Sequence, residues 1–223
     1  MAKPSDAPAV PVYYKSARAD VLALVPEEAW RVLDVGCGAG QLGQALKERD
    51  TKEVVGIELN QEAAHIAAAV LDRVICAPVE SVALEELGPP YDCIIFGDIL
   101  EHLVDPWATL HRFTTLLTPE GRVVASLPNV AHWSVVAGLL RGRWEYRDRG
   151  LLDCTHLRFF TRRSIAALFA QAGLVVERWK RNYRLREADR RYARLARGLA
   201  RGPLRDLLTF QYLIVARKRG EAQ

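Results

Sequence analysis

Short apolar runs alternate along the chain with longer stretches in which apolar residues recur every three or four positions. Five apolar runs precede residue 129, and they are 31–35, 53–59, 73–77, 91–98 and 121–128. Helical periodicity appears between them at 41–49, 61–71 and 106–118. This alternation predicts right-handed βαβ crossovers and an α/β fold whose mostly parallel sheet is covered on both faces.

The alternation stops at Asn129. Residues 129–160 are rich in aromatic residues and arginine, and they precede a helical pattern that begins at the N-cap candidate Thr161 and ends at Gly173. An insertion that follows the carboxyl end of a strand is suited to form a lid or a substrate wall. The apolar residues 207–217 then predict the final strand of the sheet.

Length and composition favour one domain. The 223 residues are half hydrophobic, enough for one sizeable core. We expect a flexible arm at 1–13, a core at 14–180 whose first helix runs from about 14 to 25, and a basic helical segment at 181–206. The final strand then belongs to the core sheet.

The chain shows no signal for export or for a membrane span. Its first residues, MAKPSDAPAVPVYY, lack the apolar stretch of a secretory leader, and no run approaches the ~20 apolar residues of a transmembrane helix. The four cysteines lie far apart, which favours reduced thiols over a zinc cage or a disulfide framework. We therefore expect a cytoplasmic protein.

Positive charge is concentrated near the C-terminus. Residues 180–205 contain ten Lys or Arg and only two acidic residues, whereas the whole chain has a net charge of +4. Apolar residues recur there at helical spacing, which favours a surface helix that packs on the core by its apolar side. Of the aromatic residues that could stack on nucleic-acid bases, only Tyr183 and Tyr192 lie among the arginines. This pattern argues against DNA and structured RNA as partners, and it suits an acidic small molecule or a membrane surface better.

The stretch RVLDVGCGAGQLG contains glycines that fit two spacings. Gly36, Gly38 and Gly40 form G-x-G-x-G, whereas Gly38, Gly40 and Gly43 form the G-x-G-x-x-G of a dinucleotide site. Both spacings place a glycine turn between the first strand and a helix, where ligands bind in open α/β sheets. The glycines alone do not identify the cofactor.

Asp34 favours a cofactor that carries positive charge. Its carboxylate lies two residues before Gly36, where it would repel a pyrophosphate but suit a ligand with an ammonium group. S-adenosylmethionine has a sulfonium, an amino-acid end and a ribose diol, and Glu58 follows at the position where a carboxylate can accept from ribose hydroxyls.

Four motifs in order resemble the class I S-adenosylmethionine-dependent methyltransferases. They are VLDVGCGAG, GIEL, FGDILEHLVDP and GRVVASLPN, over roughly residues 15 to 180. EHLVDP resembles the ubiquinone-biosynthesis O-methyltransferases, and PNVAHW, RGRW and THLRFFT resemble small bacterial relatives of the methionine-biosynthesis methyltransferase-like proteins. The resemblance implies a single-domain Rossmann-like fold with seven strands, the last of them antiparallel.

The resemblance also implies roles for particular residues. Asp34, Gly36, Gly38, Gly40 and Gly97 would line the methionine half of the cofactor. The remaining cofactor residues are Glu58 at the ribose, Leu59 beside the adenine, Arg18 at the cofactor carboxylate and the backbone at Val79.

Adenine recognition departs from the family pattern. The family usually places an Asp after the third strand, and this chain has Pro78 there. The backbone near Val79, or the Glu80 carboxylate, would have to replace it.

Transfer of a methyl group to a hydroxyl requires removal of a proton. The candidate bases are His102, His156 and Asp98, and we expect His132 and Arg158 to line the acceptor. Asp98, Glu101 and His102 are also an oxygen-rich set, but three residues on one turn rarely point at one ion. The sequence therefore predicts no metal site.

The sequence leaves three other functions open. The glycines permit an NAD-dependent oxidoreductase, and the resemblance to the methionine-biosynthesis group permits a regulatory subunit that binds the cofactor without turnover. An RNA methyltransferase remains the third, because residues 180–205 are basic. The preferred hypothesis is an S-adenosylmethionine-dependent methyltransferase acting on a hydroxyl or amine of a small molecule.

Overall fold

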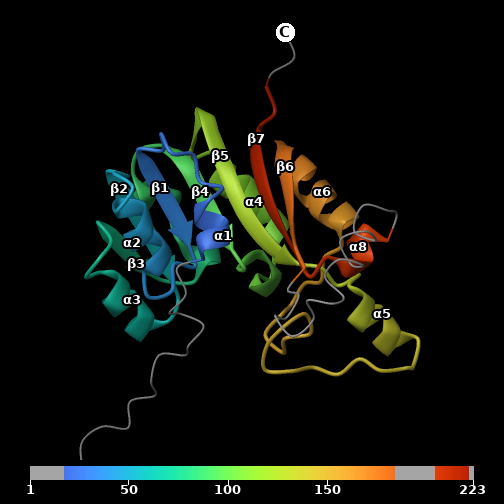
Figure 1. The fold of residues 1–223 in the computed structure, drawn as a ribbon. Helices are drawn as coiled ribbons and strands as arrows, with labels where there is room; N and C mark the ends of the chain where they lie inside the picture. The colour runs from blue at the N-terminus through green and yellow to red at the C-terminus, as the bar shows by residue number, and fades with distance from the viewer. Residues whose placement is uncertain (1–17, 184–203, 221–223) are drawn as a thin grey trace, which may run out of the picture.

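The computed structural model describes residues 18–183 and 204–220. Its core is one seven-stranded sheet with the order β3-β2-β1-β4-β5-β7-β6 (Figure 1). The strands are β1 Arg31–Val35, β2 Glu53–Glu58, β3 Arg73–Cys76, β4 Tyr91–Gly97, β5 Leu117–Pro128, β6 Leu174–Asn182 and β7 Gln211–Lys218.

The first five strands are parallel, and β7 runs antiparallel to both β5 and β6. This arrangement confirms the predicted Rossmann-like sheet with an antiparallel last strand. Every residue of β1 is buried, which explains why its apolar run does not alternate with polar residues.

Helices cover both faces of the sheet. The α-helices are α1 Ala19–Leu22, α2 Gln41–Lys47, α3 Gln61–Ala67, α4 Pro106–Thr114, α5 Trp133–Leu139, α6 Arg162–Gln171 and α8 Arg205–Leu208. Short 3-10 helices are η2 Val79–Ser81, η3 Leu84–Leu87 and η4 Leu100–His102. Apolar residues of α1, α2 and α3 pack on one face, and those of α4 and α6 pack on the other (Figure 1). No helix within residues 18–183 and 204–220 is long and apolar enough to cross a membrane.

Side chains cap the N-termini of several helices, and the cap at Thr161 confirms the sequence prediction. Thr161 caps α6, and its side chain accepts from the backbone N–H of Ser164, whose hydroxyl in turn accepts from the N–H of Thr161. Asn60 caps α3 and Asp105 caps α4 by a single bond each, in which the side chain accepts from a backbone N–H three residues on. These caps fix where each helix leaves the carboxyl edge of the sheet.

Two predicted boundaries were wrong. The helix expected at 106–118 ends at Thr114, because Leu117 is buried and pairs with Tyr91 as the start of β5. The helix expected from about 14 to 25 ends at Leu22 as α1, and residues 14–17 lie outside the described residues. The arm at 1–13 and most of the basic segment at 181–206 lie outside the described residues.

The insertion at 129–160 lies beside the sheet at its carboxyl edge. It contains α5, its two ends pair with each other through a bridge between Asn129 and Phe160, and backbone bonds attach it to η4 (Figure 1). The insertion therefore covers the edge at which the glycine turn and the β4 terminus also lie.

Candidate active site

The glycine turn joins β1 to α2. Gly36, Gly38 and Gly40 have φ values of 76°, 56° and 84°, which are costly for residues with a Cβ. The backbone N–H groups of Gly36 and Cys37 donate to the carbonyl of Ile57 at 2.8 and 3.0 Å. The turn is thereby held against the end of β2, where it leaves backbone at the edge of the sheet.

Gly43 serves packing rather than the turn. A Cβ built at Gly43 would lie 2.2 Å from the Leu71 side chain, so a larger residue would push α2 away from its neighbours. The fold therefore requires the three glycines of the turn and Gly43 as well, so both spacings are present whichever cofactor binds. This is why the glycine pattern alone could not identify the cofactor.

Asp34 is a buried carboxyl group near the end of β1. It is 3% exposed, and burial together with the negative charge of Glu58 raises its pKa to about 7, while Arg18 opposes the shift. A cationic ligand nearby would favour the ionised form of Asp34. The electrostatic setting thus fits a ligand with an ammonium or a sulfonium group.

Glu58 at the end of β2 is tied to the turn. Its Oε2 accepts from the N–H of Gly38 at 2.9 Å, and its Oε1 accepts from the N–H of Asn60 at 2.7 Å. A carboxylate has about four lone-pair sites, so both oxygens can still accept from a ribose diol. These two bonds hold the carboxylate in a fixed orientation at the end of β2.

The remaining cofactor candidates surround this cradle. A Cβ built at Gly97 would meet no atom of the described residues within 4 Å, so these residues leave space at the end of β4. Leu59 is 66% exposed, as an adenine-flanking side chain requires. Val79 is buried, and its carbonyl accepts from Arg112 at 2.9 Å. The Glu80 carboxylate accepts from the N–H of Asp105 at 2.8 Å.

Arg18 and Asp98 form a polar network between the N-terminal segment and the sheet. The guanidinium of Arg18 pairs with Asp98 and, at 3.0 Å, with Asp20. Asp98 also accepts from Ser126 Oγ at 2.8 Å and from the Gln211 amide. Both oxygens of Asp98, one of the candidate bases, are therefore engaged by protein groups, and the bonds orient Arg18 at the end of β4.

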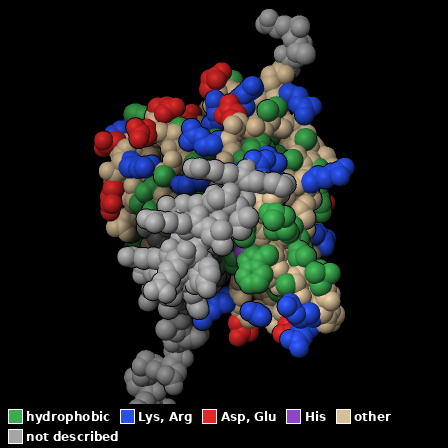
Figure 2. All heavy atoms as spheres, turned by 45° about the vertical axis from the view of Figure 1, so that its right-hand side comes forward, with side chains coloured by type: hydrophobic (Ala, Val, Ile, Leu, Met, Phe, Trp, Pro, Cys, Tyr) green, Lys and Arg blue, Asp and Glu red, His purple; other side chains and the backbone are tan. Residues whose placement is uncertain are grey.

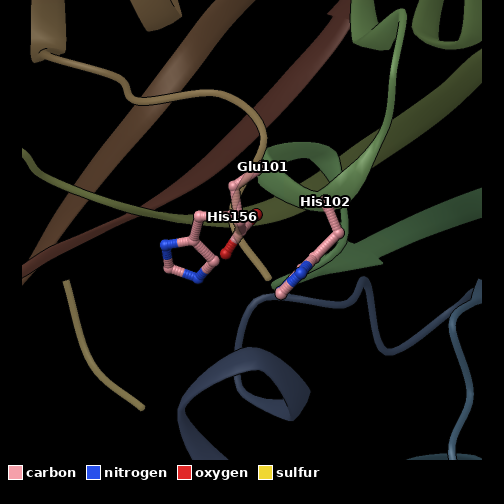
Figure 3. Close-up of side chains that lie close together, drawn as sticks. All are labelled: Glu101, His102 and His156. Carbon is pink, nitrogen blue, oxygen red and sulfur yellow. The ribbon is translucent and has the colours of Figure 1, made fainter. Parts of the chain in front are cut away.

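Glu101, His102 and His156 lie together beside this network (Figure 3). One potential ligand atom from each lies within 4.8 Å of the others, and the two imidazole centroids are 4.8 Å apart. Figure 3 shows the Glu101 carboxylate between the two imidazole rings. Glu101 is 1% exposed and His156 9% exposed. We call these three residues the EHH cluster.

Backbone bonds from the insertion assemble the EHH cluster. The N–H groups of Leu157 and Arg158 donate to the carbonyl of Glu101 at 2.9 and 3.0 Å. His102 Nδ1 lies 3.1 Å from the carbonyl of Thr155. These contacts place His156, from the insertion, against η4 at the end of β4.

The buried setting perturbs the charges of the EHH cluster. Burial, and next the negative charge of Asp98, raises the pKa of Glu101 well above its ordinary value. Burial, and next the neighbouring His102, lowers the pKa of His156. Such perturbed groups at the edge of a sheet are typical of functional sites.

His132 and Arg158 are bonded to protein groups within and beside the insertion. His132 caps α5, its Nδ1 lies 2.9 Å from Ser134 Oγ, and burial lowers its pKa. The Arg158 guanidinium donates to the carbonyls of Val104 and Leu157. Both residues were expected at the acceptor, and the bonds described here are to protein groups.

An aromatic cluster adjoins His156. Phe159 lies 6.2 Å from the His156 ring, and Trp144 packs on Phe159 at 5.1 Å and on Tyr146 at 6.4 Å between centroids. Figure 2 shows hydrophobic side chains gathered on the side of the molecule where α5 lies, with Lys and Arg around them. The insertion thus offers an apolar, ring-rich wall next to the EHH cluster.

Comparison with known proteins agrees with this geometry. Residues 11–178 match the model of the family described as "Methyltransferase domain". A ubiquinone biosynthesis O-methyltransferase of Xanthomonas oryzae pv. oryzae is 30% identical over 188 residues, which is 77% of this chain and 74% of that protein. One from Alkalilimnicola ehrlichii is 33% identical over 107 residues, but the match spans only 46% of this chain and 43% of that protein.

The fold is also that of a solved methyltransferase. An S-adenosylmethionine-dependent methyltransferase from Mesorhizobium loti has a TM-score of 0.62 at 17% identity, covering 91% of this chain and 98% of that chain. The chain belongs to the methyltransferase-domain family, and it is a class I S-adenosylmethionine-dependent methyltransferase. This membership confirms the predicted family and cofactor.

Proposed function

We propose that the protein transfers a methyl group from S-adenosylmethionine to a hydroxyl of a small, ring-bearing molecule, and that this hydroxyl is deprotonated at the EHH cluster. The observation that carries the proposal is the position of the cluster. Ile99, two residues before Glu101, approaches Gly36 so closely that a Cβ there would lie 3.0 Å from it. The cluster and the glycine turn therefore border one another.

The cofactor side supplies binding and orientation. S-adenosylmethionine brings an activated methyl group on a sulfonium, so alignment and exclusion of water provide most of the rate. The ionised Asp34 would attract the positive amino-acid end, and Glu58 would accept from the ribose hydroxyls. Gly97 leaves space for the methionine portion.

The acceptor side favours a hydroxyl attached to an apolar or aromatic body. Trp144 and Phe159 offer ring faces and edges beside His156, and aromatic pairs gain stability in such offset or edge contacts. The curated relatives are named for O-methylation in ubiquinone biosynthesis. Oxygen rather than nitrogen is accordingly the atom that we propose as acceptor.

The cellular location of the protein and its binding partners other than the methyl acceptor remain predictions. Cys37, Cys76, Cys93 and Cys154 are free cysteines, which suits the predicted cytoplasmic location. An acidic acceptor, or contact of residues 180–205 with RNA or a membrane surface, concerns a segment that lies mostly outside the described residues.

Incubation with methyl-labelled S-adenosylmethionine and a panel of phenols and catechols tests the proposal. The expected result is a labelled methyl ether on at least one member of the panel or of a metabolite extract. Cofactor binding without any product would instead favour the regulatory subunit. Label recovered on RNA, with affinity that falls steeply as salt rises, would favour the RNA methyltransferase.

A further inference from the structure

We propose that the EHH cluster binds one divalent transition-metal ion through Glu101, His102 and His156. The three side chains come from η4 and from the insertion, two segments far apart in the sequence that meet at the end of β4. Figure 3 shows the carboxylate of Glu101 between the two rings, an arrangement in which all three could reach a common point.

The strongest observation is an unsatisfied buried oxygen. Glu101 is 1% exposed, and its Oε2 has no hydrogen-bond partner among the described residues. A buried carboxylate oxygen that is left unpaired costs several kcal/mol of desolvation. A cation at this point would offset that cost, whereas neither imidazole is within hydrogen-bond reach of the oxygen.

His102 is already oriented as a metal ligand. A carbonyl oxygen can only accept, so the 3.1 Å contact between His102 Nδ1 and the carbonyl of Thr155 places the proton on Nδ1. The Nε2 atom then keeps its lone pair for an ion. Histidines that bind metals generally donate their other N–H to a carbonyl or a carboxylate in this way.

The ligand set selects the kind of ion. Two imidazole nitrogens and one carboxylate suit Zn²⁺, Mn²⁺, Fe²⁺ or Co²⁺, because Mg²⁺ and Ca²⁺ prefer oxygen ligands. Three protein ligands also leave coordination positions open for another molecule. The sequence predicted no metal site because only Asp98, Glu101 and His102 were adjacent, and the structure replaces Asp98 with His156.

The ion would explain how the acceptor hydroxyl loses its proton, and this step rests on the proposed function. An ion held by these three residues would lower the pKa of the acceptor hydroxyl, whose proton would pass to solvent. The deprotonated oxygen would then form its bond to the methyl carbon while the carbon–sulfur bond breaks and sulfur leaves as a neutral thioether. His102 and His156 then act as ligands rather than as the base.

Direct binding of metal ions tests the proposal without an activity assay. Protein freed of metal by a chelator is titrated with Mn²⁺ alone, and the loss of the free Mn²⁺ signal is followed by electron paramagnetic resonance. Zn²⁺ alone is titrated by calorimetry. We expect one site per chain, saturated below roughly 100 µM. Glu101→Gln and His156→Ala should each weaken it about 100-fold, since loss of a ligand exceeds the 10–100-fold typical of outer partners.

The matched control is His111→Ala, which removes an exposed histidine from α4 and should leave metal affinity unchanged. Thermal unfolding of each variant checks that it is folded, and His102→Ala replaces any variant that is not. Absence of a site below roughly 100 µM, or affinity that survives both Glu101→Gln and His156→Ala, overturns the metal proposal. S-adenosylmethionine binding measured on the same samples separates that failure from failure of the proposed function.

Discussion

The two sides of the carboxyl edge of the sheet are built in different ways. On the β1–β2 side, the polar groups of the turn are bonded to one another within a short stretch of chain, as Glu58 is to Gly38 and Asn60. On the β4 side, the EHH cluster depends on an insertion that comes from far along the chain, and one oxygen of Glu101 has no partner within residues 18–183 and 204–220. The β1–β2 side is a motif formed by neighbouring residues, whereas the residues of the β4 side come together only when distant parts of the chain fold against each other.

This difference indicates that the β1–β2 side determines cofactor binding, whereas the β4 side determines the acceptor and its activation. A cradle formed by local bonds can bind one cofactor whatever the acceptor is. An insertion that supplies both His156 and an aromatic wall can change the acceptor without disturbing the cradle. Substitutions on the two sides should therefore separate cofactor affinity from turnover.

Asp34→Asn should have the largest effect on the cofactor side. Removing the buried charge is expected to weaken S-adenosylmethionine binding at least 100-fold by calorimetry, because the positive groups of the cofactor lose their counter-charge. At pH 8 the same variant without cofactor should unfold at a higher temperature than the wild type, since an ionised buried carboxylate is gone. Asp148→Asn, at an exposed position, is the control and should change neither quantity.

His156→Ala should have the complementary effect. Turnover is expected to fall about 100-fold or more, because the EHH cluster, at which we propose that the acceptor hydroxyl is deprotonated, loses one of its three residues. Cofactor affinity should stay within about twofold of the wild type. If the cofactor dissociation constant rises as far as turnover falls, the two sides are not separable and the comparison fails.

Cofactor binding should depend on pH through Asp34. Its pKa of about 7 means that a minor fraction is ionised at pH 6 and most of it at pH 8, so affinity should rise about tenfold over that interval. Asp34→Asn should remove this increase, which separates it from titration of the cofactor. An affinity that falls between pH 6 and pH 8 would contradict the assigned role.

The same carboxyl group makes an opposite contribution to stability. Its pKa is higher in the folded than in the unfolded state, so between about pH 4 and pH 7 the folded state binds more protons. The free energy of unfolding of the cofactor-free protein should therefore decrease as pH rises through this interval, by on the order of 4 kcal/mol from this group. Denaturant titrations of the wild type and Asp34→Asn would measure the difference.

Gly40→Ala should destabilise the local motif more than a matched glycine elsewhere. Gly40 has a φ of 84°, and a Cβ there would lie 2.8 Å from Val70 and 3.1 Å from the backbone of Ala67. We expect a loss of about 3 kcal/mol, against about 1 kcal/mol for Gly142→Ala, which has positive φ but open space around it. Equal losses in denaturant titrations would show that strain alone, and not packing, requires Gly40.

The smallest predicted effect is at Asn60. Asn60→Ala removes the side-chain cap of α3 and should cost about 1 kcal/mol of stability. Glu58 accepts from the backbone N–H of this residue, so its orientation should survive. Cofactor affinity that stays close to the wild-type value would support this separation, and a large loss would show that the cap itself shapes the ribose site.

The sequence predicted the parts of the molecule that are specified locally. The run 31–35 became β1 with the same bounds, because five consecutive buried residues suit a central parallel strand. Asp34, the glycines and Glu58 were found from spacing, because a turn and two strand ends fix their positions.

The acceptor side could not be found in the same way. His156 reaches Glu101 only through backbone bonds between the insertion and η4, and no periodicity specifies such a contact. The engagement of Asp98 by Ser126 and Gln211 likewise depends on the sheet order, in which β5 follows β4 and β7 follows β5. Glu101 and His102 are neighbours in the sequence and could be grouped from it, but the approach of His156 to them could not be predicted.

The most direct test of the central claim is to identify the atom that receives the methyl group. The protein is incubated with S-adenosylmethionine carrying a ¹³C-labelled methyl and with a metabolite extract, and the products are examined by nuclear magnetic resonance and mass spectrometry. The account predicts a labelled methyl bound to oxygen in a ring-bearing small molecule, and loss of that product in His156→Ala but not in His111→Ala. A labelled methyl on nitrogen, or on a product that forms equally well in His156→Ala, would contradict it.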